Sequence, residues 1–454
     1  MARVLFIHPS KWGRGITPIW GASHSSVLKN KDHQVELFDC TFYPEWTENE
    51  NVLNTQNMQY RPTDYERMIE WKTSGLIEDL QLRIDEFNPD IIFWSAFSSH
   101  IHGEGEYVSI QYGYEIIEKV NSSALLIAGG LQATADPELT YKNFPELDCL
   151  IRGESELVLA QIAGEIDKNS LDYSEINGIA YKNSGNEVVV NRTQEIIGNL
   201  DLLTPYDYSL FDDQTLLRPY NGKVVRAVDY ELSRGCVFSC RYCVETVIQE
   251  YYGFCETVQG GVIKNARRYL RHKSAEMIFS ELEYLVEERG VQLLRCQDTN
   301  FLTIHHPTLL KLAELIENSQ INIQLYIETR PEGINSESVK LLKRLKVDGI
   351  GMGIELAAQD FRESELNRFS DQEKIVKAFE LLRENKIKRT AYNVIGFPQQ
   401  DEESIKNTIE FNKILDPDNI TVAFFTPYLG TEQQKKGVEK NYFVENEFDL
   451  DAQL

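Results

Sequence analysis

The sequence is poor in cysteine and in positive charge, and it lacks a long apolar run. Only 7 of its 454 residues are cysteine, and 46 lysine and arginine residues stand against 71 aspartate and glutamate residues, a formal net charge of −25. So acidic a chain is a poor candidate for nucleic-acid binding, because phosphate contacts need a basic surface. No run of about 18 apolar residues occurs, so we expect no membrane span and no membrane partner.

The beginning of the chain lacks the marks of a secretory signal. The stretch "MARVLFIHPSKWGRG" has no long apolar centre and no small-residue cleavage site. We interpret it as a first buried strand and expect a cytoplasmic protein. In a reducing compartment, clustered cysteines indicate metal binding or catalysis before disulfides. Cys40, Cys149 and Cys296 lie in apolar, strand-like stretches and are expected to be buried hydrophobic residues.

The first part of the chain, residues 1–170, alternates apolar runs with helical patterns. This alternation predicts an α/β domain with a doubly wound parallel sheet. Ligands on such sheets bind beyond the carboxyl ends of the strands, so the loops that begin at His8, Asp39, Ser95 and Gly129 are candidates. The expected strands lie at 3–10, 34–42, 90–99, 124–130 and 148–154, with helical patterns at 68–87 and 114–121.

A second strand–helix series follows a connector at 171–225, in which 178–192 reads as a small hairpin. The series predicts a partial (β/α)6 barrel over 226–431, with function at the carboxyl ends of its strands, and then a tail at 432–454. A basic stretch at 264–273 is interpreted as a solvated helix end, with a grip on an anionic substrate as the alternative. Strands are expected at 228–235, 291–301, 321–330, 348–356, 390–398 and 419–428, with helices such as 275–290 and 371–386 between them.

Three of the seven cysteines gather in "ELSRGCVFSCRYCVET" (231–246): Cys236, Cys240 and Cys243. Structural zinc normally takes four cysteine or histidine ligands, and the next cysteine is Cys255. A four-iron cluster usually takes one thiolate per iron, so three thiolates leave one iron open to a small chelating ligand. We favour a [4Fe-4S] cluster held by the three cysteines; zinc with Cys255, or no metal, are the alternatives.

The C-x3-C-x2-C spacing, with Tyr242 before the last cysteine and a first barrel strand before the motif, resembles the radical S-adenosylmethionine (SAM) superfamily. The resemblance implies that SAM chelates the open iron. It implies that Glu355 in "GIGMGIELAAQ" binds the ribose and that Arg368 in "LNRF" pairs with the carboxylate of SAM. It also implies that the backbone near Ile395 and Gly396 approaches the adenine. The alternatives are a structural strand-end carboxylate for Glu355 and a surface arginine for Arg368.

The front part resembles the cobalamin-binding domain of one branch of this superfamily, through "VLFIHPS", "VELFDC", "LLIAGGLQA" and "LIRGESE". The resemblance implies that Gly129 and Gly130 approach the nucleotide tail of cobalamin; an ordinary strand-to-helix turn is the alternative. The D-x-H-x-x-G run of many cobalamin domains is absent, and Gln132 stands where many relatives have histidine. His100 and His102 could face the corrin or the substrate, with exposure to solvent as the simpler expectation.

The sequence therefore predicts a cobalamin-dependent radical SAM methyltransferase that acts on an unactivated carbon of a small molecule in a biosynthetic pathway. One alternative is a radical SAM dehydratase, cyclase or rearrangement enzyme without methyl transfer. An alternative of another class is a zinc-stabilised binding protein without catalysis. The expected partners are a small-molecule substrate and an electron donor such as flavodoxin or ferredoxin.

Overall fold

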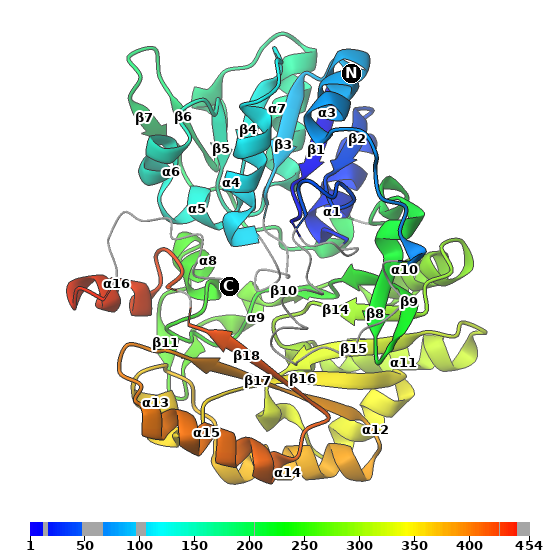
Figure 1. Cartoon of the computed structure of the whole chain (residues 1–454), viewed down its shortest axis with the longest axis vertical. Helices are drawn as coiled ribbons and strands as arrows, with labels where there is room; N and C mark the ends of the chain where they lie inside the picture. The colour runs from blue at the N-terminus through cyan, green and yellow to red at the C-terminus, as the bar shows by residue number, and fades with distance from the viewer. Residues whose placement is uncertain (12–16, 48–66, 97–105, 204, 426, 443–454) are drawn as a thin grey trace. The chain divides into compact units, whose positions relative to one another are not determined.

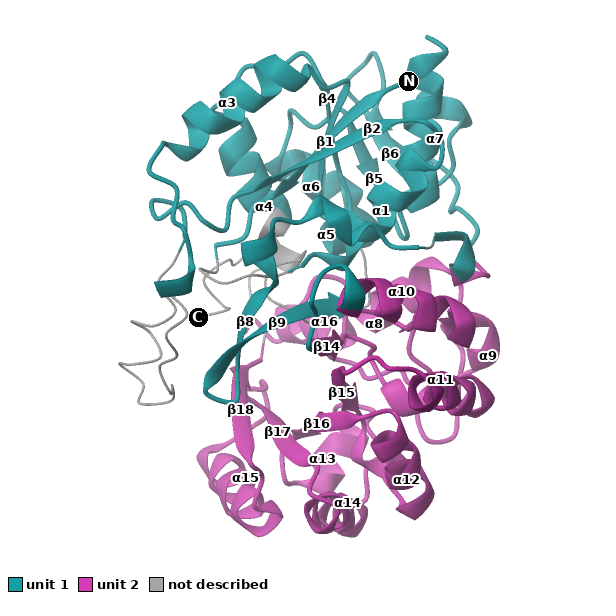
Figure 2. Cartoon of the chain, turned by 90° about the vertical axis from the view of Figure 1, so that its right-hand side faces the viewer, with its two compact units in different colours: residues 1–197, 201–229, 287–292 teal, residues 198–200, 230–286, 293–454 magenta. Residues whose placement is uncertain are grey.

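The structure is a computed structural model, and it describes residues 1–11, 17–47, 67–96, 106–203, 205–425 and 427–442 (Figure 1). The chain divides into two compact units (Figure 2). Unit 1 comprises Met1–Ile197, Asp201–Asp229 and Glu287–Gln292. Unit 2 comprises Gly198–Leu200, Tyr230–Val286 and Leu293–Leu454. Most of the predicted connector, 171–225, therefore belongs to unit 1.

Unit 1 contains a seven-stranded sheet of order β2-β1-β3-β4-β5-β6-β7. The strands β1 to β5 run parallel, and β6 and β7 join them as an antiparallel hairpin at the edge. The predicted hairpin at 178–192 is thus part of this sheet. The bounds are β1 (Arg3–His8), β2 (Gln34–Asp39), β3 (Ile91–Trp94), β4 (Leu125–Ala128), β5 (Cys149–Ile151), β6 (Ile179–Lys182) and β7 (Val188–Val190).

Helices cover both faces of this sheet, as the side chains of β1 illustrate. Leu5 and Ile7 pack in one cluster with apolar residues of α3 and α4. Phe6, between them in sequence, points to the other face and meets Trp20 of α1 edge to face at 5.4 Å. A strand covered on both faces needs a continuous apolar run, which "VLFI" supplies. The helices are α1 (Ile19–Lys29), α3 (Leu76–Phe87), α4 (Glu106–Ile117), α5 (Gly130–Ala135), α6 (Pro137–Asn143) and α7 (Glu156–Asp167).

The predicted helix at 68–87 begins later than expected, at Leu76. Gly75 takes an extended backbone conformation and forms its N-terminal boundary. The helix ends where Asn88 adopts a left-handed conformation with φ of 48°. The helical periodicity of the apolar residues predicted this helix, and Gly75 marks where it starts.

Unit 2 is built on parallel strands in the order β14-β15-β16-β17-β18, with β14 joined to the end of β9 by the bond from Gln297 N to Tyr230 O at 2.8 Å. Five of the predicted barrel strands are confirmed as β14 to β18, with shifts at their ends. The first, predicted at 228–235, overlaps only the end of β9 and the short strand β10 (Ser233–Arg234). The bounds are β14 (Leu293–Cys296), β15 (Gln324–Thr329), β16 (Val347–Glu355), β17 (Lys388–Ile395) and β18 (Asn419–Phe424). The earlier strands β8 (Leu217–Tyr220) and β9 (Lys223–Tyr230) belong to unit 1, except for Tyr230.

Amphipathic helices cover one face of this half-barrel sheet. Ile350, Met352 and Ile354 of β16 are buried, and so are Leu342 and Phe379 of the neighbouring helices. Side-chain caps set several helix starts, such as Asp371 on α14 and the capping box of Asn335 on α12. The helices are α10 (Ala275–Glu287), α11 (His306–Asn318), α12 (Ser336–Arg344), α13 (Gln359–Ser364), α14 (Gln372–Glu384), α15 (Glu402–Leu415) and α16 (Glu432–Glu439).

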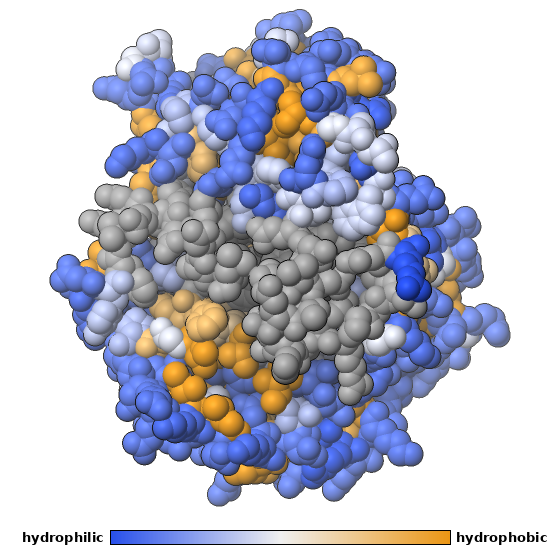
Figure 3. Space-filling model, in the orientation of Figure 1, coloured by the Kyte–Doolittle hydropathy of each residue, from blue (hydrophilic) through white to orange (hydrophobic). Residues whose placement is uncertain are grey.

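The last strand, β18, is the edge strand of the sheet and is exposed along its length, including the apolar residues Ile420, Val422 and Phe424. These side chains alternate along the strand with Thr421 and Ala423, so they share one face of the sheet. Hydrophobic residues are scattered over the otherwise largely hydrophilic face in Figure 3. The predicted C-terminal tail begins with helix α16, and its residues 443–454 lie outside the described part of the chain. No helix among the described residues has the length and apolar character of a membrane span.

Candidate functional site

The three clustered cysteines lie on one loop of unit 2, between β10 (Ser233–Arg234) and helix α8 (Glu245–Tyr251). The loop begins at Gly235, which has φ of +91°; a Cβ at this position would lie 2.6 Å from the Tyr269 carbonyl oxygen. Only glycine fits such a position. At the other end of the loop, Cys243 N donates to Cys240 O at 3.0 Å, which closes a tight turn. The backbone therefore fixes this loop from both ends.

The surroundings of the thiols disfavour free thiolates. Burial, and then the negative charge of Glu245, raise the pKa of Cys236 to about 12. Burial also raises the pKa of Cys243 well above its ordinary value, with the neighbouring Cys240 next in effect. Thiolates at such positions require the positive charge of a metal centre beside them. The donor set thus fits a cluster, which would hold the cysteines ionised.

The donor geometry is also informative. Among the described residues, no three His, Cys, Asp or Glu side chains converge closely enough to bind a single metal ion. A four-iron cluster does not require such convergence, because each thiolate binds a different iron. Cys255, which the zinc alternative needs as a fourth ligand, is exposed, whereas Cys40, Cys149 and Cys296 are buried as predicted.

Glu355 and Arg368 come together beside the cysteine loop. Tyr242, which precedes the last cysteine, donates its hydroxyl proton to Glu355 Oε1 at 2.9 Å. Arg368 Nη2 lies 3.5 Å from the same carboxylate oxygen and donates to Gly353 O at 2.6 Å. Arg368 is only 5% exposed, so the surface-arginine alternative is wrong. Glu355 has the structural partners Tyr242 and Arg368, as the alternative of a structural strand-end carboxylate requires.

The backbone of β16 is shaped for this arrangement. The register with β17 shifts between Gly353 and Glu355, and Glu355 has φ of 61°, which is unusual for a residue with a side chain. A Cβ on Gly353 would clash with Glu355 Oε1 and would lie 3.0 Å from Arg368 Nη2. The missing side chain of Gly353 therefore makes the room that the carboxylate and guanidinium groups occupy.

The end of β17 leaves open space next to this group. Gly396 has φ of +87°, and in the described part of the chain no atom beyond its two chain neighbours lies within 4 Å of the position that a Cβ would take. Both polar atoms of the Gln399 amide are buried and have no hydrogen-bond partner among the described residues. Open backbone with unpaired polar atoms nearby fits a flat, polar ring such as adenine. The predicted contacts of Ile395 and Gly396 with SAM stay predictions.

One small apolar cluster joins these strand ends. It contains Leu356, Leu366, Phe397 and Phe425, and the Tyr242 ring packs against Phe397 at a centroid distance of 5.9 Å. The ends of β16 and β17 and the cysteine loop are therefore one packed assembly. The structure thus brings together the predicted cluster and SAM residues of unit 2.

Several residues that hold this assembly were missed by sequence reasoning. Asp298, fully buried after β14, accepts from Ser233 N at 2.6 Å and Leu232 N at 3.1 Å and so fixes the chain just before the cysteine loop. Arg330 lies over the Phe238 ring of that loop at 3.8 Å. Arg362 donates to the carbonyl oxygen of Ala357 at 2.7 Å, in the turn after β16. Charged residues after strands are common, so no pattern in the sequence distinguished these.

In unit 1, two polar atoms at the carboxyl edge of the sheet are buried without a partner among the described residues: His8 Nε2, at the end of β1, and Gln132 Nε2, just after β4. Burial is the main cause that lowers the pKa of His8, which favours the neutral form of its ring. This is the edge at which parallel sheets bind ligands. Unpaired buried polar atoms there fit a polar cofactor or substrate.

Packing within unit 1 already favours glycine at the two positions that we predict to approach cobalamin. A Cβ on Gly129 would lie 3.0 Å from Ser95 O and 3.2 Å from Ile151 O. Gly130 has φ of +88°, and a Cβ there would lie 2.8 Å from Ser95 Oγ. The strand-to-helix turn thus explains both glycines, and their contact with a cofactor stays a prediction. His100 and His102 lie outside the described residues.

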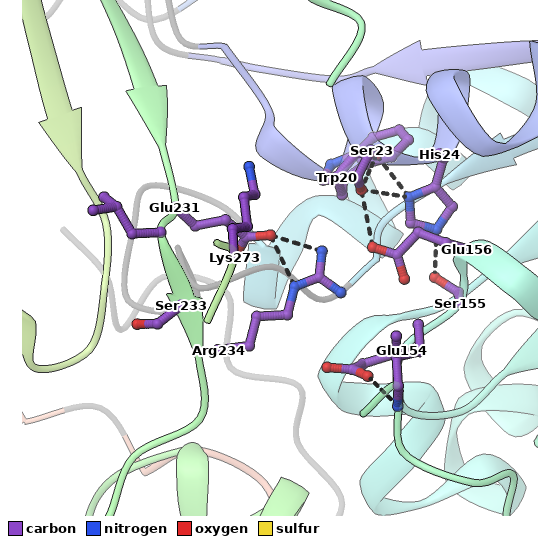
Figure 4. A network of polar contacts seen from close by, with 12 residues as sticks. Trp20, Ser23, His24, Glu154, Ser155, Glu156, Glu231, Ser233, Arg234 and Lys273 are labelled. Carbon is purple, nitrogen blue, oxygen red and sulfur yellow. Dashed lines mark hydrogen bonds and ion pairs between the residues drawn. The ribbon is translucent and has the colours of Figure 1, made fainter. Parts of the chain in front are cut away.

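The "GESE" stretch that supported the cobalamin resemblance joins α7 to α1 (Figure 4). Glu156 Oε1 accepts from Ser23 Oγ at 2.9 Å. His24 bridges Ser155 Oγ, 2.7 Å from its Nε2, and Trp20 O, 2.6 Å from its Nδ1. These buried contacts stabilise the helix pair on one face of the sheet, so this stretch is structural in unit 1.

The interpretation of the basic stretch 264–273 as a solvated helix end is wrong for its last residues. Lys273 is fully buried, and its ammonium group donates to Glu281 Oε2 at 2.8 Å and lies 4.2 Å from the centre of the Tyr230 ring. Figure 4 also shows the second buried pair of this region, Glu231 with Arg234, at 2.7 Å. Internal partners rather than solvent balance these cations, a pairing that one-dimensional charge patterns do not reveal.

Comparison with known proteins identifies the class of unit 2. Residues 230–411 match the family model of the radical SAM superfamily, so this part of the chain carries a radical SAM domain. An uncharacterized methyltransferase of Pyrococcus horikoshii is 25% identical over 375 residues, which are 82% of this chain and 75% of that protein. The anaerobic magnesium-protoporphyrin IX monomethyl ester cyclase of Rubrivivax gelatinosus is 24% identical over 462 residues, 97% of this chain and 72% of that protein.

Solved structures share the fold over nearly the whole chain. The radical SAM methyltransferase TsrM from Kitasatospora setae, solved with cobalamin and a [4Fe-4S] cluster, matches with a TM-score of 0.68 at 17% identity, covering 98% of this chain and 76% of that one. The cobalamin-dependent radical SAM enzyme OxsB, solved with aqua-cobalamin, matches with a TM-score of 0.64 at 16% identity, covering 90% of this chain and 52% of that one. The predicted fold class, a doubly wound parallel-sheet domain followed by a partial barrel, is confirmed.

Proposed function

We propose that this chain is a cobalamin-dependent radical SAM methyltransferase that methylates an unactivated carbon of a small molecule in a biosynthetic pathway. The observation that carries the radical SAM part of the proposal is the assembly of unit 2: three cysteines on one loop, with Tyr242, Glu355 and Arg368 in contact beside it. The cobalamin-dependent methyl transfer is supported by the fold that the chain shares with TsrM. The family match of residues 230–411 and the methyltransferase relative support it. The family match and the exposure of Cys255, which a zinc site would need as its fourth ligand, argue against the alternative of a zinc-stabilised binding protein.

The residues of unit 2 have distinct roles in this proposal. Cys236, Cys240 and Cys243 hold the cluster, which together with SAM supplies the electron transfer and radical that activate the substrate. The Glu355 carboxylate accepts from the ribose hydroxyls of SAM, and Arg368 pairs with the SAM carboxylate. Gly396 and Ile395 leave backbone free for the adenine. The chain's own contribution is placement and the exclusion of water around these groups.

Unit 1 is the proposed cobalamin domain. TsrM and OxsB, whose fold the chain shares, were solved with cobalamin. His8 and Gln132 supply the buried, unpaired polar atoms at the sheet edge that a large polar cofactor would satisfy. Gly129 and Gly130 form the turn after β4 at this edge, and their approach to the nucleotide tail of cobalamin is part of the proposal. Bound cobalamin would supply the methyl group.

A cyclase without methyl transfer is the second candidate. It rests on the Rubrivivax gelatinosus relative, whose similarity spans 97% of this chain. Both candidates use the same cluster and SAM residues, so the geometry of unit 2 favours neither. The product distinguishes them.

The expected partners follow from the chemistry. A reduced flavodoxin or ferredoxin would supply the electron, and a small molecule would be the substrate; TsrM was also solved with a tryptophan substrate. The three thiols must stay reduced to bind iron, so we propose a reducing compartment, the cytoplasm.

The test is anaerobic purification with added cobalamin and mass analysis of the products made from SAM. A methyltransferase forms both 5′-deoxyadenosine and S-adenosylhomocysteine, and it adds the mass of one methylene group to its product. Formation of 5′-deoxyadenosine without S-adenosylhomocysteine would contradict methyl transfer and favour the cyclase. The absence of both in cluster-loaded protein would contradict each candidate.

A further inference from the structure

Helix α8 holds the peptide that carries Cys236 from both sides. Glu245 Oε1 accepts from Cys236 N at 3.0 Å. One turn later, Gln249 Nε2 donates to Cys236 O and to Phe238 O, each at 2.9 Å. Residues four apart lie on the same face of a helix, so the two side chains form a clamp on the first cysteine of the motif.

The two parts of the clamp differ in charge. Glu245 and Gln249 are both only 2% exposed. A glutamine at position 245 could accept the same hydrogen bond without bringing a negative charge into a buried site, where an ion is costly. The hydrogen bond to Cys236 N therefore requires an oxygen acceptor at position 245, but it does not require the negative charge of a carboxylate.

The negative charge of Glu245 affects the reduction potential of a cluster that is bound by the loop. The reduction potential of an iron–sulfur cluster depends on the net charge around it and on hydrogen bonds to its sulfur atoms. A buried carboxylate next to one ligand repels an added electron strongly, because the local dielectric constant is low. The Cys236 N–H is directed at Glu245, so that carboxylate competes with any sulfur atom for this donor. Both effects make the cluster harder to reduce and the reduced cluster a stronger electron donor.

We propose that Glu245 is a positioning residue that sets the cluster potential low, by its charge and by taking the Cys236 N–H. The inference rests on the proposed function, since it requires the cluster. A strongly reducing cluster suits the cleavage of a sulfonium, which needs an electron at low potential. Gln249 completes the clamp but contributes no charge.

The test is an anaerobic redox titration of the full chain after reconstitution with iron and sulfide, followed by the EPR signal of the reduced cluster. Glu245→Gln keeps an oxygen acceptor for Cys236 N and removes the charge, and Glu245→Ala removes both. The matched control is Glu250→Gln, which makes the same change at an exposed position of the same helix. Iron content is measured on every variant.

We expect both Glu245 variants to load iron like the wild type and to show a cluster midpoint potential shifted to more positive values, with no shift in Glu250→Gln. An unchanged midpoint in Glu245→Gln and Glu245→Ala would overturn the inference. Failure of both variants to load, while Glu250→Gln loads, would also overturn it, because Glu245 would then hold the cluster rather than tune it. If the wild type itself took up no iron, the proposed function would fail instead.

Discussion

At the scale of single residues, the site depends on a few buried charges whose partners lie far away in the sequence. Glu355 is shared by Tyr242, more than a hundred positions earlier, and by Arg368. In the cofactor-bound protein the carboxylate would exchange part of these contacts for the ribose hydroxyls. We therefore predict that the negative charge of Glu355 matters for the binding of SAM and less for the binding of the cluster.

The Glu355→Gln variant tests whether the charge of Glu355 serves the binding of SAM rather than the binding of the cluster. Hydrogen bonds to a charged group contribute about 1.5–3 kcal/mol, so we expect SAM to bind roughly 10- to 100-fold more weakly. Iron content should stay at the wild-type level. Equilibrium binding of SAM to the reconstituted protein measures the effect, with Glu380→Gln on the exposed face of α14 as control. Equal affinities in wild type and Glu355→Gln would remove Glu355 from the SAM site.

Asp298 makes the stability of unit 2 depend on pH. Burial is the largest influence on this carboxyl group and raises its pKa from 3.8 to about 7, against the opposing effect of hydrogen bonds from Ser233 and Leu232. Because the folded state holds this proton more tightly than the unfolded state, the contribution of Asp298 to stability falls as the pH rises from about 4 to about 7.

Replacing Asp298 by Asn keeps an oxygen acceptor and removes this titration. We expect the free energy of unfolding of Asp298→Asn to decline less than that of the wild type between about pH 4 and about pH 7. Urea unfolding at both pH values, on protein without cluster, measures it, and exposed Asp360→Asn is the control. The same pH dependence in wild type and Asp298→Asn would contradict the assignment.

At the scale of elements, periodicity predicted most of the fold, because buried strands such as β1 need unbroken apolar runs and surface helices such as α14 need an apolar stripe. The cysteine motif and the strand-end motifs around Glu355 and Gly396 pointed to residues that the structure brings together in unit 2, and the roles of these residues toward a cluster and SAM stay predictions. What could not be predicted was side-chain pairing across the fold. Lys273 reads as a surface charge in the sequence, and only the neighbouring helix α10, which carries Glu281, makes it a buried one.

The buried pair of Lys273 and Glu281 fastens β13 (Arg271–His272) to α10. Replacing Glu281 takes the carboxylate away from a buried ammonium group, and breaking a buried ion pair in this way costs about 3–5 kcal/mol. We expect Glu281→Ala to lower the free energy of unfolding of unit 2 by that amount. Glu317→Ala breaks an exposed pair with Arg344 and should cost at most about 1 kcal/mol. Equal losses in the two variants, measured by urea unfolding, would count against a buried pair.

Gly351 tests the register of the half-barrel sheet. A Cβ at this position of β16 would clash with the ring of Tyr392, on the adjacent strand β17. Overpacking of this kind costs about 1–3 kcal/mol, so Gly351→Ala should destabilise unit 2 by that amount. In a Tyr392→Ala background the additional loss should disappear, because the ring is gone. An equal loss in both backgrounds, in denaturant unfolding, would mean that the two strands pair differently.

At the scale of the whole molecule, an acidic chain combines a parallel-sheet unit and a half-barrel unit. In each unit, the residues that we predict to bind a ligand lie at the carboxyl ends of the strands. In unit 1 these ends carry buried polar atoms without described partners at His8 and Gln132. In unit 2 they carry the cysteine loop and the Glu355–Arg368 pair. The predicted chemistry assigns the methyl donor to the first and the radical to the second.

The claim on which all else depends is that Cys236, Cys240 and Cys243 hold a cluster whose open iron lets SAM be cleaved. The most direct measurement is iron content together with 5′-deoxyadenosine release on reduction, in anaerobic wild type and in single cysteine-to-alanine variants. We predict about four irons per chain and release of 5′-deoxyadenosine in the wild type and in Cys255→Ala, and loss of both when any of the three is replaced. Full iron content and 5′-deoxyadenosine release in Cys236→Ala, Cys240→Ala or Cys243→Ala would contradict the account.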